Sequence, residues 1–271
     1  MPILGVSSIY MYPKSVVKTI EDAAMMGFRH INIFAFPPHF KEDSDEFIVK
    51  VRKKLFEYGL DCSIKIQGYT INLAATNPNL RRKSIEEVNY WIDVASKLDC
   101  SAIIMRAGMF FYTERVFKEK TYNELITTLQ DITERTESQG IEVCIENYPY
   151  PFDIIALPSD LIRLSKSLKG RTYLALNISH LYDIHRNRRI DVFSDLKTAL
   201  PWVKVVYISE YVNPWDYPHK PDKQHWESYI EFLRRSFQII RGGELNIAII
   251  VGYSKDDVLN AKNFITQYLF F

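Results

Sequence analysis

The chain alternates eight short, strand-like segments with segments that carry helical spacing, over 271 residues. Each strand-like segment is five to seven residues long and mostly apolar, and most meet Gly, Pro, Asn or Asp within a few residues, as buried parallel strands do. The predicted strands are Ile3–Ile9, His30–Phe34, Ser63–Gly68, Ser101–Arg106, Glu142–Glu146, Tyr173–Ile178, Val203–Ser209 and Asn246–Val251. Strand–helix units in series imply parallel pairing through right-handed crossovers. Eight such units at this length favour an α/β fold closed into a (β/α)8 barrel over an open doubly wound sheet.

The intervening segments carry helix signals. Gly27 follows Ser15–Met26 as a helix-terminating glycine, and Ser84 stands three residues before a glutamate, the pattern of a capping box. Further helices are predicted over Lys120–Ser138, Leu161–Leu168, Asp191–Leu200 and His225–Ile240, and from Ser254 onwards. No linker, repeat or shift in composition divides the chain, so residues 1–271 are predicted to form one domain.

Charge and cysteine content bound the partners and the compartment. Lys and Arg number 34 and Asp and Glu 33, a balance that gives no reason to expect nucleic-acid or membrane-surface binding. The three cysteines show no CxxC spacing, which indicates reduced thiols and a cytoplasmic protein. We see no basic leader and no apolar run long enough to cross a membrane. The expected partner is a small molecule, and an oligomer is compatible with the sequence.

A barrel of this kind places its chemistry at the C-terminal ends of its strands. The residues at or just beyond those ends are Arg106, Glu146, Asn177, His180, Tyr207, Glu210 and Val251.

Several of these strand ends resemble motifs of a known family. Gly68–Ala74 (GYTINLA) is similar to the PY-x-INLA segment after the third strand of apurinic-site endonucleases and their relatives. Ile145–Asn147 resembles the xEN that ends the fifth strand of sugar isomerases and epimerases, and Leu176–His180 resembles the LDxxH of the sixth, with Asn in the Asp position. Tyr207–Glu210 resembles the HxxD/E of the seventh strand, and His219–Pro221 resembles the start of the following loop. In this order the motifs identify a divergent member of the xylose isomerase-like TIM-barrel superfamily, which includes sugar phosphate isomerases and epimerases and apurinic-site endonucleases.

The resemblance implies a metal site that this chain has mostly lost. In the isomerase and epimerase branch, Glu, Asp, His and Glu from the fifth to eighth strands hold a divalent metal such as Mg, Mn or Co. The matching positions here are Glu146, Asn177, Tyr207 and Val251, and only the first keeps its ligand. Loss of the eighth-strand carboxylate also removes half of the two-carboxylate proton shuttle of the epimerases.

The endonuclease branch holds several zinc ions through additional histidines. Those third- and fourth-strand positions fall on Ile66 and Arg106. Glu146, His180 and His219 are the remaining ligand types, too few for a three-zinc cluster. A rebuilt site for Mn, Mg, Co or Zn around Glu146 and His180, joined by Glu210 and His219, stays open as an alternative to no metal.

The predicted catalytic residues are Glu146 and His180. Glu146 ends an apolar strand, so its carboxylate needs either a chemical role or a buried partner, and Arg106 at the neighbouring strand end is the expected partner. Arg106 is alternatively a clamp for a substrate anion or carbonyl. His180 is a general acid or base, or a hydrogen-bonded structural residue.

Other residues are predicted to line the mouth and bind substrate. Aromatic side chains there suit stacking on a sugar ring, and plain packing is the alternative. With Arg106, the predicted substrate-binding set is Asn177, Tyr69, Tyr207, Glu210, Trp215 and His219.

Three functions follow from these residues. The first is a divergent sugar (phosphate) isomerase- or epimerase-like enzyme acting on a small polyhydroxy or keto-sugar compound. The second is a catalytically inactive barrel that serves as a binding or scaffold protein, because several metal ligands are missing together. The third is a relative of abasic-site DNA endonucleases, against which the near-neutral charge and the missing zinc ligands count.

Overall fold

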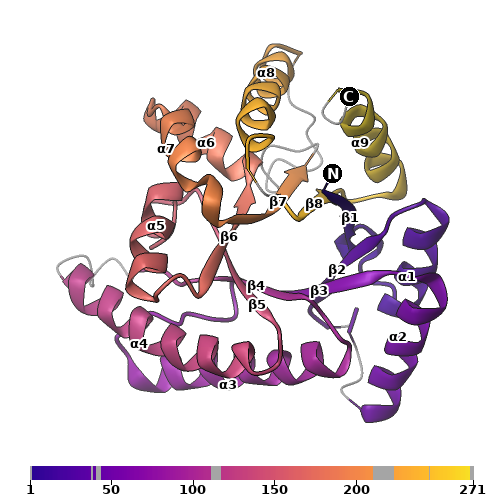
Figure 1. The fold of residues 1–271 in the computed structure, drawn as a ribbon, viewed down its shortest axis with the longest axis horizontal. Helices are drawn as coiled ribbons and strands as arrows, with labels where there is room; N and C mark the ends of the chain where they lie inside the picture. The colour runs from indigo at the N-terminus through magenta and orange to yellow at the C-terminus, as the bar shows by residue number, and fades with distance from the viewer. Residues whose placement is uncertain are drawn as a thin grey trace.

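The computed structural model describes residues 2–37, 39–40, 44–110, 117–209, 223–243 and 245–268. Eight parallel strands form a closed barrel in chain order, and β8 pairs with β1 to complete it. The strands are β1 (Ile3–Ser7), β2 (His30–Ala35), β3 (Asp61–Ile66), β4 (Ala102–Arg106), β5 (Glu142–Glu146), β6 (Thr172–Asn177), β7 (Val203–Ser209) and β8 (Ile247–Val251). The predicted (β/α)8 barrel is therefore confirmed (Figure 1).

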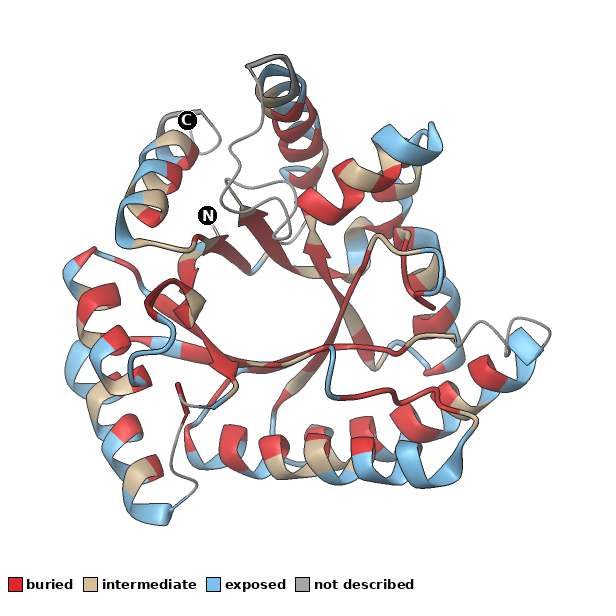
Figure 2. Cartoon of the chain, turned by 180° about the vertical axis from the view of Figure 1, so that it is seen from behind, coloured by how far each residue is buried: buried red, intermediate tan, exposed pale blue. Residues whose placement is uncertain are grey.

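Helices surround the barrel and bury their inward faces against it, while their outward faces are exposed (Figure 2). They are α1 (Val16–Met25), α2 (Asp45–Tyr58), α3 (Pro78–Lys97), α4 (Lys118–Glu137), α5 (Pro158–Ser167), α6 (Ile178–Arg188), α7 (Val192–Ala199), α8 (Lys223–Ile240) and α9 (Lys255–Tyr268), with 3-10 turns at Ser8–Met11 and Leu200–Trp202. Within the described ranges, none of these helices combines the length and apolar character needed to span a bilayer.

Three details differ from the sequence prediction. Helices α2 and α6 were not predicted, and α6 begins directly at Ile178, where the sixth strand was expected to end. The capping box at Ser84 is wrong, because α3 begins at Pro78 behind the N-cap Asn77. Ser84 lies inside that helix, where its hydroxyl accepts a hydrogen bond from the backbone N–H of Asn72 at 2.9 Å. The serine therefore anchors the segment after β3 instead of starting a helix.

A neutral hydrogen-bonded network crosses the barrel interior. Asn32 donates from Nδ2 to Ser63 Oγ at 2.8 Å, and the phenol of Tyr207 donates to Asn32 Oδ1 at 3.0 Å. His30 Nε2 completes the network at 2.9 Å from the same Ser63 hydroxyl. Burial lowers the pKa of His30 to about 4, so this imidazole is uncharged at neutral pH. The network links β2, β3 and β7 beneath the mouth without placing a charge in the core.

Candidate active site

A cavity of about 270 Å³ opens at the C-terminal ends of the strands. Seven of the eight strands contribute a side chain to it, and β4 is the exception. The strand residues that line it are Ser7, Phe34, Lys65, Glu146, Asn177, Ser209 and Val251. Its volume matches a small ligand, and its position is where barrels of this type carry their chemistry.

The Lys65–Glu146 ion pair lies at the floor of this cavity. Alternation along β3 turns Lys65 to the same side as Ser63, into the barrel. Its Nζ atom lies 3.0 Å from Oε1 and 2.8 Å from Oε2 of Glu146, and 4.4 Å from the centre of the Tyr207 ring. The Glu146 side chain is 1% exposed and that of Lys65 is 16% exposed. The lysine ammonium therefore faces the cavity while the carboxylate is hidden behind it.

The charge state of Glu146 follows from these contacts. Burial by itself raises the pKa of Glu146, but the positive charge of Lys65 and the hydrogen bonds from Asn177 and Lys65 outweigh it and hold the pKa below its ordinary value. Glu146 is therefore a carboxylate at neutral pH. The expected ion pair between Glu146 and Arg106 is wrong, because Lys65 takes that place.

Asn177 joins Glu146 to the first turn of α6. Its Nδ2 donates to Glu146 Oε1 at 3.0 Å, and its Oδ1 accepts from the backbone N–H of His180 at 3.3 Å as the N-cap of the helix. An amide can donate at one end and accept at the other, whereas an aspartate would turn a second negative charge toward Glu146. Asn in place of Asp at the end of the sixth strand therefore fits a site with one carboxylate, Glu146, and one positive charge, the ammonium of Lys65.

His180 lies in the same turn and lines the cavity. Its Nδ1 is 2.7 Å from the backbone carbonyl of Asn147, which can only accept, so Nδ1 carries the hydrogen and Nε2 keeps a lone pair. Burial lowers the pKa of His180, although the nearby Glu146 charge opposes this. The imidazole ring lies 4.9 Å from that of Tyr148, between centroids. A neutral imidazole fixed in this tautomer has the properties of a general base.

Arg106 forms a second buried ion pair, behind the cavity wall. Its Nε donates to Asp153 Oδ1 at 2.7 Å, and Nη2 hydrogen-bonds to the same oxygen. Its Cζ lies 4.7 Å from the centre of the Tyr148 ring. Burial raises the pKa of Asp153 to about 6 against the opposing charge of Arg106. The arginine is 2% exposed and fixes the loop after β5, so its predicted role in substrate binding stays a prediction.

A glycine allows the chain after β3 to pass close over this arginine. A Cβ atom at Gly68 would lie 2.8 Å from the Tyr148 hydroxyl and 3.2 Å from Arg106 Cβ. Any larger residue at this position would push aside the segment itself, the Tyr148 hydroxyl or the arginine. Gly68 thus sets the spacing between the third and fourth strand ends.

The remaining predicted residues occupy different places. Tyr69 lines the cavity and is 53% exposed, as expected for a mouth aromatic. Tyr207 is buried beneath Lys65 and donates to Asn32, so it does not line the cavity. The predicted residues Glu210, Trp215 and His219 lie outside the described residues. Sequence reasoning missed Lys65, whose signal was a charge between two isoleucines of a strand, and Asp153, which belongs to a loop.

The described donors do not fit the divalent metal that the resemblance implies. Both carboxylate oxygens of Glu146 contact the ammonium of Lys65, and Asn177 turns its N–H2 group toward them. Tyr207 donates to Asn32, and Val251 has no donor atom to offer. Within the part of the chain that the structure describes, no three His, Cys, Asp or Glu side chains converge closely enough to hold an ion.

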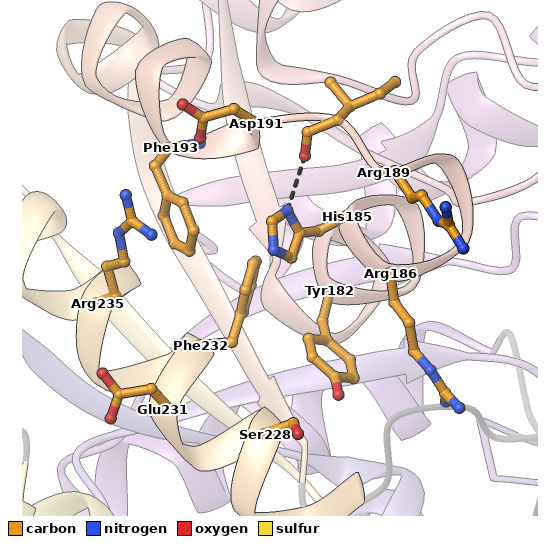
Figure 3. A pocket seen from close by; sticks show the side chains of 11 residues that line it. Tyr182, His185, Arg186, Arg189, Asp191, Phe193, Ser228, Glu231, Phe232 and Arg235 are labelled. Atoms are coloured by element: carbon orange, nitrogen blue, oxygen red, sulfur yellow. Dashed lines mark hydrogen bonds between the residues drawn. The ribbon is translucent and has the colours of Figure 1, made fainter.

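A second, wider hollow of about 820 Å³ lies on the outer helices (Figure 3). Its lining comes from α6, α7, α8 and the segment between α6 and α7. His185 donates from Nδ1 to the carbonyl of Ile190 at 2.7 Å, and the Arg235 guanidinium lies 3.8 Å from the centre of the Phe193 ring. None of its lining residues comes from a strand end, so the barrel mouth is the stronger candidate for chemistry.

Comparisons with known proteins bear on the family and the fold. A family model described as xylose isomerase-like TIM barrel matches residues 20–242. Uncharacterized protein MJ1311 of Methanocaldococcus jannaschii is 20% identical over 270 residues, which cover 98% of this chain and 88% of that protein. A solved D-tagatose 3-epimerase-like protein superimposes with a TM-score of 0.79 at 18% identity, covering 98% of this chain and 97% of the other. D-psicose 3-epimerase, solved in the presence of D-fructose, superimposes with a TM-score of 0.78 at 17% identity, covering 98% and 99%. At these identities the solved structures show the shared fold.

Proposed function

The chain belongs to the xylose isomerase-like TIM barrel family, and from this premise we propose that it is a divergent isomerase- or epimerase-like enzyme. It removes and returns a proton on the carbon next to the carbonyl of a small keto-sugar or related polyhydroxy compound. The reaction takes place at a barrel mouth that has lost most of its metal ligands. The observation that carries the proposal is a fixed neutral His180 beside the ionised Glu146, both lining a cavity of about 270 Å³. The sugar 3-epimerases that share its fold support a sugar-like ligand.

His180 is the proton carrier in this proposal. Its Nε2 lone pair accepts the proton from the carbon next to the carbonyl, and the resulting imidazolium is stabilised by the negative charge of Glu146 nearby. The Nδ1 hydrogen bond to Asn147 keeps the ring oriented throughout. Delivery of the proton to the adjacent carbon of the enediolate, while the hydroxyl on that carbon passes its proton to the original carbonyl oxygen, gives the isomerised product. Delivery of a proton from water to the opposite face of the original carbon, while His180 loses its proton to water, gives the epimer. Tyr69 and Tyr148 offer ring surfaces for the carbon skeleton.

Exchange of substrate hydrogen with solvent tests the proposal directly. The purified protein is incubated in D2O with D-fructose, D-tagatose and D-psicose, and deuterium entry beside the carbonyl is followed by NMR. We expect exchange with at least one ketose, and a fall of about 10²- to 10⁴-fold in His180→Gln, because a positioned general base contributes that much. His185→Gln, in the outer hollow, is the matched control and should keep the wild-type rate. Absence of exchange across the panel, or an unchanged rate in His180→Gln, contradicts the proposal.

One observation favours a binding protein as the second candidate. Glu146 and Asp153 are both already held in ion pairs, and the eighth strand ends in the apolar Val251. A barrel with this arrangement can hold a polyhydroxy ligand without turning it over. Ketose binding in calorimetry, with no deuterium exchange for any bound sugar, would establish this alternative.

A further inference from the structure

We infer that Lys65 takes the place of a divalent cation in this barrel, and that its ammonium group binds the carbonyl or enediolate oxygen of an uncharged hydroxy-ketone. The inference rests on the proposed function for the identity of the substrate, but its metal and ligand-binding consequences are measured separately.

The donors around Lys65 are matched to a single positive charge. Glu146 is the carboxylate that contacts its ammonium, and Asn177 completes the pair with a neutral amide. A divalent ion in the same place would need further anionic donors, while one ammonium balances one carboxylate. Within the described ranges, the only other buried carboxylate beside the mouth is that of Asp153, and Arg106 already holds it.

The ammonium group still has bonding capacity toward the cavity. It carries three N–H donors. One of them donates to Glu146 Oε1, while Oε2, at 2.8 Å, makes an ion-pair contact without hydrogen-bond geometry. The Tyr207 ring, 4.4 Å away, covers another side of the cation and adds a cation–π attraction. Among the described residues, the contacts with Glu146 and Tyr207 therefore leave at least one N–H for a ligand in the cavity that Lys65 lines.

The position of Lys65 is fixed by the barrel. The residue sits within β3, paired with Phe34 of β2 and Ile104 of β4. Its anchor Glu146 is 1% exposed and is itself the last residue of β5. A donor held this rigidly can stabilise a developing negative charge without reorganising during the reaction.

The chemistry balances without a metal or a redox partner. The proton beside the carbonyl moves to His180 Nε2, and the electron pair of that C–H bond becomes the C=C bond of the enediolate. The carbonyl π electrons move to oxygen, where a hydrogen bond from Lys65 stabilises them. Lys65 keeps its own proton. Among the described residues that line the cavity Lys65 is the sole Lys or Arg, and its charge is balanced by Glu146, which favours an uncharged substrate over a phosphorylated one.

Metal binding is the first test. The full chain is treated with EDTA, dialysed and titrated with Mn²⁺, and then Mg²⁺, Co²⁺ and Zn²⁺, in a calorimeter. We expect no stoichiometric binding at the mouth and no change in deuterium exchange upon EDTA treatment. Stoichiometric Mn²⁺ binding that is lost in Glu146→Gln would overturn the inference, whatever the activity.

Ligand binding is the second test, with glycolohydroxamate as a planar mimic of an enediolate. We expect metal-free wild-type protein to bind it and Lys65→Met to bind it about 10- to 100-fold more weakly, the range expected for one charge-assisted hydrogen bond. Because Lys65→Met leaves Glu146 unpaired, the neutral double variant Lys65→Met/Glu146→Gln serves as a second cation-free protein with the same expected loss. Lys204→Met, which removes a strand lysine at the opposite end of the barrel, should leave binding unchanged.

The outcomes separate the two proposals. Absence of binding to the wild type, a need for Mn²⁺, or equal binding by Lys65→Met overturns the inference about Lys65. Metal-free binding through Lys65 without deuterium exchange on any ketose upholds this cation and refutes the proposed enzyme.

Discussion

Strand β5 carries a glutamate at each end, and the two glutamates show how position in the barrel changes the burial and pairing of the same side chain. The side chains of residues 142, 144 and 146 lie on the same side of the strand, and Cys144 packs in the barrel interior. Glu142 pairs with Lys204, whose Nζ lies 5.0 Å from the centre of the Tyr173 ring. Glu146 pairs with Lys65, whose Nζ lies 4.4 Å from the centre of the Tyr207 ring. Each end of the barrel therefore has a lysine, a glutamate and a tyrosine together.

The two trios differ in distance and in exposure. Nζ and the nearest carboxylate oxygen are 3.8 Å apart at Glu142 and 2.8 Å apart at Glu146. The Glu142 side chain is 37% exposed, while that of Glu146 is 1% exposed. Water screens the first pair strongly and the second only weakly, because the Glu146 carboxylate is buried. The trio at the N-terminal ends of the strands is thus a marginal surface contact, whereas the trio at the mouth is a fixed charge pair that a ligand can use.

Removing the glutamate charge from each pair should give the largest difference in stability between the two ends of the barrel. Glu146→Gln leaves a largely buried lysine without its partner, and we expect a loss of about 3 to 5 kcal/mol in the free energy of unfolding. Glu142→Gln breaks a screened pair and should cost less than about 1 kcal/mol. Urea unfolding followed by circular dichroism measures both variants, which share the strand, the residue type and the kind of partner. Equal losses would show that burial does not distinguish the two ends.

Double-mutant cycles isolate the pair itself from the cost of truncation. Lys65→Met with Glu146→Gln should give a coupling energy of about 2 kcal/mol, in the upper range for residues in direct contact. Lys204→Met with Glu142→Gln should give less than about 0.5 kcal/mol, as exposed pairs do. The measured quantity is the free energy of unfolding of each single and double variant. A coupling energy at the mouth as small as that at the other end would contradict the tight pairing seen at Glu146.

Acid should remove the stabilisation that the Lys65–Glu146 pair gives the folded protein. The pKa of Glu146 is raised by burial but lowered further by Lys65 and its hydrogen bonds, so its folded-state pKa lies below the unfolded one. The unfolded chain then binds more protons between the two values, and the stabilisation is complete above the unfolded pKa and is lost as pH falls through the folded pKa. The difference in stability between wild type and Glu146→Gln should narrow below about pH 4.3, by at most about 1.4 kcal/mol per pH unit. A difference that widens on acidification would contradict the lowered pKa.

The barrel itself was predictable from sequence because its signal is periodic. All eight predicted strands overlap the observed ones, since buried parallel strands are apolar segments bounded by turn residues. Helix α6 was missed because it starts at Ile178 with no intervening turn, so the apolar segment of β6 reads on into it. The serine at position 84 satisfies a capping pattern, yet Asn77 and Pro78 begin that helix further upstream.

The site was predictable only where a motif marked it. Glu146, Asn177 and His180 meet around one carboxylate, as their strand-end positions suggested. The partner of Glu146 comes from elsewhere: Lys65 belongs to β3, 81 residues away in the chain. Arg106 likewise pairs with Asp153, which lies in a loop 47 residues away. Local sequence patterns do not encode which charge lies across a barrel. The expected Arg106–Glu146 pair failed for that reason, although the two residues are neighbours in the β4–β5 register.

Removing the tyrosine hydroxyls should give the smallest difference in stability between the two ends, and it separates the role of the hydroxyl from that of the ring. Tyr207→Phe keeps the ring beneath Lys65 and removes the hydroxyl that donates to Asn32 at 3.0 Å. The buried Asn32 oxygen then loses this donor, and we expect a loss of about 1 kcal/mol or slightly more in the free energy of unfolding. Tyr173→Phe, in a half-buried position at the other end, should stay within about 0.5 kcal/mol of wild type. Because the ring remains, glycolohydroxamate binding should be unchanged in Tyr207→Phe. A large loss of binding there would show that the phenol hydroxyl, and not only the ring, holds the ammonium of Lys65 in place.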